Sequence, residues 1–406
     1  MEETVDRISS LPDELLTHIL SFVTTKVAVQ TSILSKRWRH IWVSVPVLKF
    51  EYDNEDFDGD TGEDLKFEQF VDGVLQNRRA LLDTVIYDCY FEHSTWEPST
   101  EWLDRVALLM PRVIRVYVVA EYFKCPDSVF SCSSLESLNL SLHTPIDQFI
   151  DVSPKSISLP CLKTLKLCAL ELCDNFMQQL FTGCPALESL TLHSCILYIS
   201  GISSNVLKNL TLFDCSQNTQ TLRVSCPGLV SLSIFSGDYN IRCISFDNMA
   251  SLVNADIKLL GYDDYLVPDN PRLVSGLSNA TSLVLHLYCP PELQLHWKKD
   301  IANCTTFNNL KSLKIISSDM IGDFDLIACF LWHSPALQHL TLIADVHLFF
   351  EEGIGDTLEE ARQDFCFQRE YLEEVKIYCY NDYELASKLV SMVGRCVKTI
   401  GKIIIR

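Results

Sequence analysis

Apolar residues recur along most of the chain in one pattern: a leucine, a second leucine three residues later, and a third two residues after that. Because the last two are two positions apart, both point to one face of a short strand. The strict pattern occurs five times, at Leu135/Leu138/Leu140, Leu162/Leu165/Leu167, Leu187/Leu190/Leu192, Leu207/Leu210/Leu212 and Leu337/Leu340/Leu342, with an overlapping copy at Leu167/Leu170/Leu172. Relaxed copies raise the number of units to twelve: Leu82/Val85/Tyr87, Val113/Val116/Val118, Leu229/Leu232/Ile234, Leu252/Ala255/Ile257, Ala280/Leu283/Leu285, Leu310/Leu313/Ile315 and Leu372/Val375/Ile377.

These units start 20 to 35 residues apart. That spacing overlaps the period of about 20 to 29 residues of leucine-rich repeats and exceeds it where loops are inserted. One unit cannot bury its own apolar face, whereas stacked units align their strands in parallel and share a core. Another kind of buried parallel sheet is the alternative, but a βαβ fold would not keep this register in twelve copies. The pattern therefore predicts a curved solenoid, with Cys195 and Cys215 facing inward as repeat cysteines do.

The first 50 residues lack the repeat and favour helices. Pro12, two acidic residues and apolar residues at 11, 15, 16, 19, 20 and 23 predict one amphipathic helix. A second helix is expected over residues 26–34, and a third from Ser35 as N-cap until Pro46 ends it, with Trp38 and Trp42 one turn apart. Three short helices make a marginal domain, so part of their apolar surface is expected to need a partner.

The N-terminal segments also resemble a known family. The residues that carry the resemblance are the run Asp6 to Leu16, then Ile19 to Phe22, then Ser32 to Arg39, and Trp42. They are similar to the F-box of plant-type F-box/leucine-rich-repeat proteins (the F-box/FBD/LRR family). Phe67, Phe70, Val71, Val74 and Leu75 follow at helical spacing, as in the family's linker helix, so the resemblance covers nearly the whole chain.

The C-terminal segment resembles the FBD segment of the same family. It includes Cys366, Leu372, Val375 and Ile377, followed by a helical stretch near 384–393. The family's glycine before that helix is absent, because residues 380–383 read Tyr-Asn-Asp-Tyr. We expect a cap that covers the open edge of the last repeat.

The resemblance implies an α/β fold: a three-helix F-box followed by a leucine-rich-repeat solenoid, a horseshoe like that of ribonuclease inhibitor. The implied domains are the F-box at 1–50, an acidic linker and linker helix at 51–80, the repeats at 81–365 and the FBD-like cap at 366–406. The stretch 51–64 holds eight carboxylates but lacks the glycine and the final glutamate of a calcium loop, so a solvated linker is the better interpretation.

The resemblance further implies the non-catalytic substrate receptor of an SCF-type (Skp–cullin–F-box) ubiquitin ligase. Its F-box would dock on a Skp-type adaptor, and through it on a cullin, while its repeats would hold the protein to be ubiquitinated. The adaptor-facing residues implied by the family pattern are Leu11, Pro12, Leu15, Leu16, Ile19 and Leu20, with Ile33, Leu34, Trp38 and Trp42 divided between the module's core and the interface. The alternative is that all ten lie in the core.

The open face of the predicted strands carries the residues between the leucines. Along it, His193, Phe213 and Phe235 share one position in three consecutive units. Aromatic side chains often dominate interface energies, so this row is a candidate contact for the substrate protein. Packing beneath a loop is the alternative.

Charge and composition narrow the partners. The chain has 33 Lys plus Arg against 53 Asp plus Glu, a formal charge of −20 that opposes binding to nucleic acid or anionic membranes. There is no apolar run long enough to cross a bilayer, no basic signal-peptide start and no C-x-x-C pair among 17 cysteines. We therefore expect free thiols and a cytoplasmic or nuclear location.

Motifs of catalysis and of cofactor binding are absent. The sequence contains no G-x-x-x-x-G-K-S/T, H-E-x-x-H, G-x-S-x-G or G-x-G-x-x-G, and its His and Cys residues lack metal-ligand spacing. No catalytic residue, metal or cofactor is therefore predicted. Two other functions stay open: a repeat scaffold or inhibitor that never joins a ligase, and an enzyme of unfamiliar design.

Overall fold

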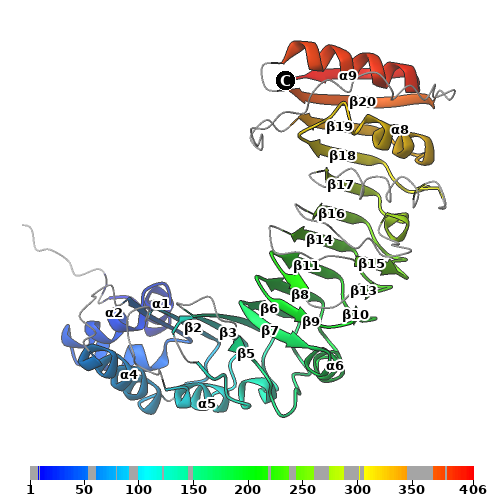
Figure 1. Ribbon diagram of the computed structural model, residues 1–406. Coiled ribbons are helices and arrows are strands. Elements are labelled where there is room, and N and C mark those ends of the chain that lie inside the picture. Colours follow the sequence, from blue (N-terminus) through cyan, green and yellow to red (C-terminus); the bar gives the residue numbers. More distant parts are fainter. Residues whose placement is uncertain are drawn as a thin grey trace, which may run out of the picture. The chain divides into compact units, whose positions relative to one another are not determined.

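Figure 1 shows the computed structural model of the chain. The chain forms two compact units, Met1–Tyr198 and Ile199–Arg406. The structure describes residues 8, 10–53, 61–78, 80–90, 99–120, 123–144, 150–217, 221–236, 244–259, 274–287, 301, 306–344, 369–379 and 382–406. Within this part of the chain, no helix is long and apolar enough to span a membrane.

Short helices make up the N-terminal module. They are α1 (Asp13–Leu20), α2 (Thr25–Gln30), the 3-10 turn η1 (Thr31–Ile33), α3 (Trp38–Ile41) and the 3-10 turn η2 (Trp42–Ser44). Pro12 immediately precedes α1, and the Thr24 side chain caps α2 by accepting from the Val27 amide. The third helix begins at Trp38, which corrects the expected start after Ser35. Its N-cap residue is Arg37, whose side chain bonds to the start of α1.

Parallel strands follow the module in the first unit. Their order in the sheet is that of the chain: β1 (Val47–Asp53), β2 (Thr84–Tyr90), β3 (Val113–Val119), β4 (Ser137–His143), β6 (Thr164–Cys168) and β8 (Ser189–His193). Between them come α4 (Thr61–Gln76), α5 (Glu101–Leu108), η3 (Val129–Ser131) and α6 (Asp174–Gly183). A smaller parallel sheet contains β5 (Ile150–Asp151), β7 (Leu170–Cys173) and β9 (Ile196–Tyr198). Helices α4 and α5 cover the leucine-bearing face of the first strands, since Phe67 of α4 and Trp102 of α5 both contact the Tyr87 ring of β2, with ring centroids 5.9 and 4.2 Å apart.

The second unit repeats the arrangement. Its long sheet contains β11 (Asn209–Phe213), β14 (Ser231–Ser236), β16 (Asn254–Leu259), β17 (Ser282–Leu287), β18 (Ser312–Ser317), β19 (His339–Ala344), β20 (Arg369–Cys379) and β21 (Val397–Ile405), all parallel. A second sheet contains β10 (Gly201–Ser203), β13 (Leu222–Ser225) and β15 (Ile244–Asp247), and the short strand β12 is Ser216–Gln217. The helical segments are η4 (Ser275–Leu277), α8 (Phe324–His333) and α9 (Tyr383–Cys396). α9 connects β20 to β21 (Figure 1).

Alternate residues of every repeat strand are buried, as the leucine pattern predicts. Leu190 and Leu192 are 0% exposed, while Thr191 between them is only half-buried. Each of the twelve predicted repeats contributes a strand to a long parallel sheet, but one predicted repeat is placed two residues too late. The structure pairs Ile114 with Leu138 and Val116 with Leu140, so the inward-facing row begins at Ile114, two residues before the predicted Val116. The error arises because alternating valines fit two registers equally well.

Backbone hydrogen bonds set this register at the start of each strand. The Arg112 carbonyl accepts from the amides of both Glu136 and Ser137, at 2.8 and 3.0 Å. The Lys311 carbonyl does the same for Gln338 and His339, at 2.8 and 2.9 Å. A single backbone carbonyl therefore links one repeat to the next, and this link does not depend on which side chains the residues carry.

The end of several strands is equally regular. Ala169, Ser194 and Asp214 occupy equivalent positions directly after β6, β8 and β11, and each has a positive φ of 49° to 59°. This left-handed residue turns the chain, and the residue directly after it, Leu170, Cys195 or Cys215, is buried. The two cysteines thus face inward, as predicted, and all thirteen cysteines in the described part of the chain are free thiols.

Alternating charges connect the first strands along one row. Arg112 lies 3.3 Å from Asp83 and 2.8 Å from Glu136, and Lys163 lies 2.9 Å from the other oxygen of Glu136. Hydrogen bonds first from Arg112 and then from Lys163 lower the pKa of Glu136 from an ordinary 4.5 to about 2. Because the folded-state pKa is lower than that of the unfolded chain, the ionised carboxylate stabilises the folded state.

We predict that Glu136→Gln lowers the urea unfolding midpoint at pH 7. The stabilisation is present above the unfolded pKa of about 4.5 and is lost as the pH falls towards 2, so the difference from the unsubstituted chain should shrink over that range. Urea titrations at pH 7, 5 and 3 measure it, with the exposed Glu370→Gln as control. A difference that stays constant with pH would contradict the assignment.

Candidate functional site

The N-terminal module has a hydrophobic core of its own. Its buried residues are Leu16, Leu20, Ala28, Trp38, Ile41 and Val45, with Leu11, Val23 and Trp42 packed against them. Leu16 and Leu20 lie one turn apart on α1, so both point to the same side of that helix. The module therefore closes its own core and does not need the exposed side of α1 to do so.

Other apolar side chains of the module face outward and are 45% to 84% exposed. They are Ile8, Leu15, Ile19, Phe22, Val27, Ile33 and Leu34, here called the apolar patch. Ile33 and Leu34 lie between α2 and α3, where a turn brings two adjacent apolar residues to the surface at 84% and 65% exposure. Several large apolar residues exposed on so small a module mark a site of interaction.

The ten residues predicted to serve the adaptor fall into three groups. Pro12, Leu15, Ile19, Ile33 and Leu34 are exposed, Leu11 and Trp42 are half-buried, and Leu16, Leu20 and Trp38 are buried. Leu16 and Leu20 were expected on the adaptor-facing side, and the structure instead places them in the core. A six-residue apolar set spans more than one face of a helix, so its spacing alone does not separate the inner row from the outer one.

Three residues of the apolar patch were not predicted: Ile8, Phe22 and Val27. The signal for Phe22 was available, because it continues the outer row of Leu15 and Ile19 at helical spacing. The His18 ring packs edge-on against the Phe22 ring, with centroids 4.9 Å apart, and supports it at the end of α1.

Polar bonds fix the geometry of the patch. The Arg37 Nε donates to Asp13 Oδ1 at 2.8 Å, and its guanidinium also donates to the Leu11 carbonyl. These bonds join the turn before α3 to the start of α1. The two halves of the patch, α1 and residues 33–34, are thereby held in one arrangement.

The module is also anchored to the first strand. The Lys49 amide of β1 donates to the Thr25 Oγ1 of α2 at 2.8 Å. Arg78, just beyond α4, is buried and donates to the carbonyls of Val45 and Leu81. Burial lowers the pKa of Arg78 to about 10, so it remains a cation at neutral pH.

On the open face of the second unit, two of the candidate substrate residues lie side by side. Phe213 of β11 is paired in register with Phe235 of β14, and their ring centroids are 5.8 Å apart. Phe235 also contacts the His286 ring edge-on at 6.0 Å, and His286 lies 3.3 Å from Asp256. Phe213 is 38% exposed, so the row offers aromatic surface rather than being packed beneath the described segments.

His193, the third candidate, belongs to the first unit. Its Nδ1 lies 3.2 Å from Cys168 Sγ and 3.1 Å from Ser194 Oγ, and Cys168 also lies 3.7 Å from His143 Nε2. Burial raises the pKa of the Cys168 thiol, which is therefore a poor nucleophile. Within the described segments no set of three His, Cys, Asp or Glu residues is arranged to hold a metal ion. Residues 54–60 of the acidic stretch 51–64 lie outside those segments.

The C-terminal segment forms a strand, a helix and a final strand. β20 pairs with β19 and β21, and α9 packs against both β20 and β21. Asp382, in the segment 380–383 where the resemblance led us to expect a glycine, caps α9: its carboxylate accepts from the Leu385 amide at 2.8 Å. Cys366, part of the resemblance to the FBD segment, lies outside the described residues.

A small helical module with an exposed apolar patch, followed by parallel strands with inward leucines at a regular spacing, defines the class of F-box proteins with leucine-rich repeats. Residues 8–50 match the F-box domain, and residues 109–264 match the family described as "FBD-associated F-box protein At5g56370, LRR repeats". F-box domains generally bind Skp-type adaptors.

Comparison with known proteins gives the particular family. Three similar proteins of Arabidopsis thaliana are the F-box/FBD/LRR-repeat proteins At4g00160, At2g04230 and At1g13780. They are 32%, 30% and 29% identical over 371, 358 and 382 residues, covering 86%, 84% and 84% of this chain and 74%, 75% and 80% of the relatives. The chain belongs to the F-box/FBD/LRR-repeat family.

The division of α1 into an inner and an outer row can be tested by a matched pair of substitutions. We predict that Leu16→Ala destabilises the module by about 2 to 5 kcal/mol because it leaves a cavity, whereas Leu15→Ala, at 48% exposure, costs about 0.5 kcal/mol or less. Hydrogen exchange of the amides of residues 13–44, followed by mass spectrometry, measures both. Equal acceleration in the two variants would show that the rows are not distinct.

Proposed function

We propose that this chain is the substrate-recognition subunit of an SCF-type ubiquitin ligase. In this proposal the apolar patch docks on a Skp-type adaptor, which connects the chain to a cullin. The observation that carries the proposal is the patch itself: an F-box module with a complete core nevertheless exposes Leu15, Ile19, Phe22, Ile33 and Leu34.

The energetics favour a docked state. Complete burial of an exposed large apolar side chain contributes about 1.5 to 3 kcal/mol. The seven side chains of the patch are 45% to 84% exposed, so the burial of each would contribute about half of that amount or more. Even after the cost of association, a fraction of this sum supports a stable complex. A scaffold or inhibitor that never joined a ligase would leave this surface in water without a use.

The repeats take the role of substrate receptor in the proposal. Stacked parallel strands with inward leucines support a continuous solenoid, a horseshoe like that of ribonuclease inhibitor, whose open face is available for a protein ligand. We assign no chemistry to the chain, since ubiquitin transfer would be carried out by other subunits. Its place of action would be the cytoplasm or the nucleus.

Charge placed in the apolar patch tests the adaptor site. We predict that the double substitution Ile33→Asp with Leu34→Asp weakens binding to a recombinant Skp-type adaptor by about 100-fold or more, because carboxylates would be desolvated in an apolar interface. Isothermal titration calorimetry with the full chain measures the dissociation constant.

Leu108→Asp is the matched control for this experiment. Leu108 ends α5, outside the module, and is 82% exposed, so the same chemical change there should leave adaptor binding unaltered. Far-ultraviolet circular dichroism checks that both variants are folded. Adaptor binding that is equal in the patch variant and the control would overturn the proposed docking surface.

Substrate binding is proposed at the row of His193, Phe213 and Phe235. We predict that Phe213→Ala with Phe235→Ala lowers the recovery of substrate proteins in proximity labelling with a proteasome inhibitor by about fivefold or more, since aromatic anchors dominate interfaces. Trp332→Ala is the control, because Trp332 is an aromatic residue on α8 with 56% exposure. Recovery of the adaptor should be the same in all three chains. Undiminished substrate recovery in the double variant would exclude these two rings as anchors.

A further inference from the structure

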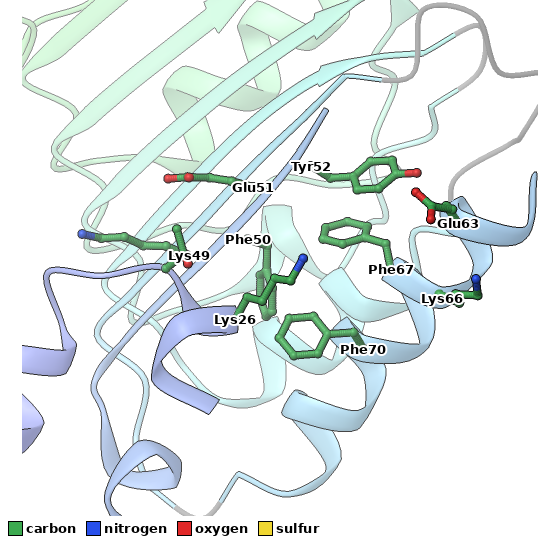
Figure 2. Close-up of a pocket in the computed structure, with 10 residues that line it drawn as sticks. Lys26, Lys49, Phe50, Glu51, Tyr52, Glu63, Lys66, Phe67 and Phe70 are labelled. Atoms are coloured by element: carbon green, nitrogen blue, oxygen red, sulfur yellow. The ribbon is translucent and has the colours of Figure 1, made fainter. Parts of the chain in front are cut away.

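A pocket lies where the F-box module meets the first strand and the helix after it (Figure 2). It has a volume of about 510 Å³, within the usual range for small-molecule sites. Its lining comes from α2 and the residue before it, β1 and α4, namely Thr24, Lys26, Lys49, Phe50, Glu51, Tyr52, Glu63, Lys66, Phe67 and Phe70. All of these residues belong to the first unit.

Aromatic rings form the apolar part of the pocket. Tyr52 and Phe67 are stacked with centroids 4.6 Å apart, and Phe50 and Phe70 meet edge to face at 6.2 Å. Phe50 is 1% exposed and belongs to the core, whereas the other three rings are only half-buried. Their free surface is what a flat ligand would cover, because offset and edge-on ring contacts are favourable at these spacings.

A hydrogen bond to a buried carboxylate fixes the orientation of the Tyr52 ring. Its hydroxyl bonds to Asp64 Oδ1 at 2.6 Å, and Asp64 is fully buried in the first turns of α4. The ring is therefore held against Phe67 before any ligand arrives. A prearranged wall of this kind lowers the entropy cost of binding.

The net charge of the residues that line the pocket is opposite in sign to the net charge of the whole chain. Three lysines and two glutamates line it, a balance of +1, while the whole chain carries −20. No ion pair joins Lys26 or Lys66 to another residue that the structure describes, and both are exposed. In Figure 2 the Lys26 ammonium points towards the Phe67 ring, whereas Lys49 and Glu51 extend away from it.

We propose that this pocket binds a small organic anion with a flat apolar body, an aryl carboxylate being the simplest case. The aromatic rings would cover the body and Lys26 would meet the carboxylate. An inorganic anion would make no favourable contact with the rings, and an uncharged aromatic molecule would form no ion pair with the lysine. Because the lining spans the F-box module, β1 and α4, such a ligand would also bind these three elements together.

The probe for this proposal is 2-naphthoate, with the uncharged 2-naphthamide as its analogue. We expect saturable binding of 2-naphthoate to the full chain, about tenfold tighter than that of 2-naphthamide, as one charge-assisted hydrogen bond provides. Saturation-transfer NMR and calorimetry measure the two affinities. Lys26→Met should reduce the affinity for 2-naphthoate to that for 2-naphthamide.

Lys36→Met serves as the matched control. It removes the same charge from an exposed residue of the same module that does not line the pocket, and it should leave both affinities unchanged. Since Lys26 and Lys36 are both exposed, neither substitution touches the core. The proposal is overturned if the full chain does not bind 2-naphthoate, if it binds 2-naphthamide equally well, or if the two lysine variants lose affinity equally.

Discussion

The structure depends on one constraint: a repeat unit cannot bury its own leucines. A strand of five to seven residues presents two or three of them on one face, and only the neighbouring strands and the helices behind can remove that face from water. The parallel register is therefore obligatory, because a shift by one residue would turn every leucine outward. The carbonyl shared by two amides at the start of each strand fixes the register through the backbone. Side chains on the open face are thus free to vary.

The first and the last strand, β1 and β21, each leave one edge without a neighbouring strand in the described part of the chain, and the two edges are protected in different ways. At the first edge the Lys49 amide of β1 donates to Thr25 of the F-box module instead of to another strand. At the last edge β21 carries Lys398 and Lys402, both exposed, which discourage pairing with a further chain. The F-box module therefore also caps the first edge of the strands. At the last edge, the lysines of the FBD-like segment itself oppose pairing with another chain.

Sequence patterns predicted the repeat strands well because leucine burial imposes the pattern directly. They missed β1, although Val45, Leu48 and Phe50 follow the relaxed pattern and all three are buried, because these residues were assigned to the F-box. They also missed β21, whose isoleucines lack the spacing of a unit. In the candidate site, the pattern identified the apolar residues of α1 but could not tell which of them are buried in the core and which are exposed. Which side of a short helix is inner depends on what packs against it, and that is decided by distant residues such as Trp38 and Ile41.

Helix α2 shows how closely the proposed activities are connected. Successive residues of a helix point about 100° apart, and four of them here meet four environments: Thr25 bonds to β1, Lys26 faces the aromatic pocket, Val27 belongs to the apolar patch and Ala28 lies in the module's core. A helix of six residues is held in place by the elements around it, so its residues move together. Any displacement of α2 by a ligand in the pocket would therefore also move Val27, and with it part of the patch proposed to meet the adaptor. Occupancy of the pocket and affinity for the adaptor would then be coupled by the same amount in both directions, as linkage requires.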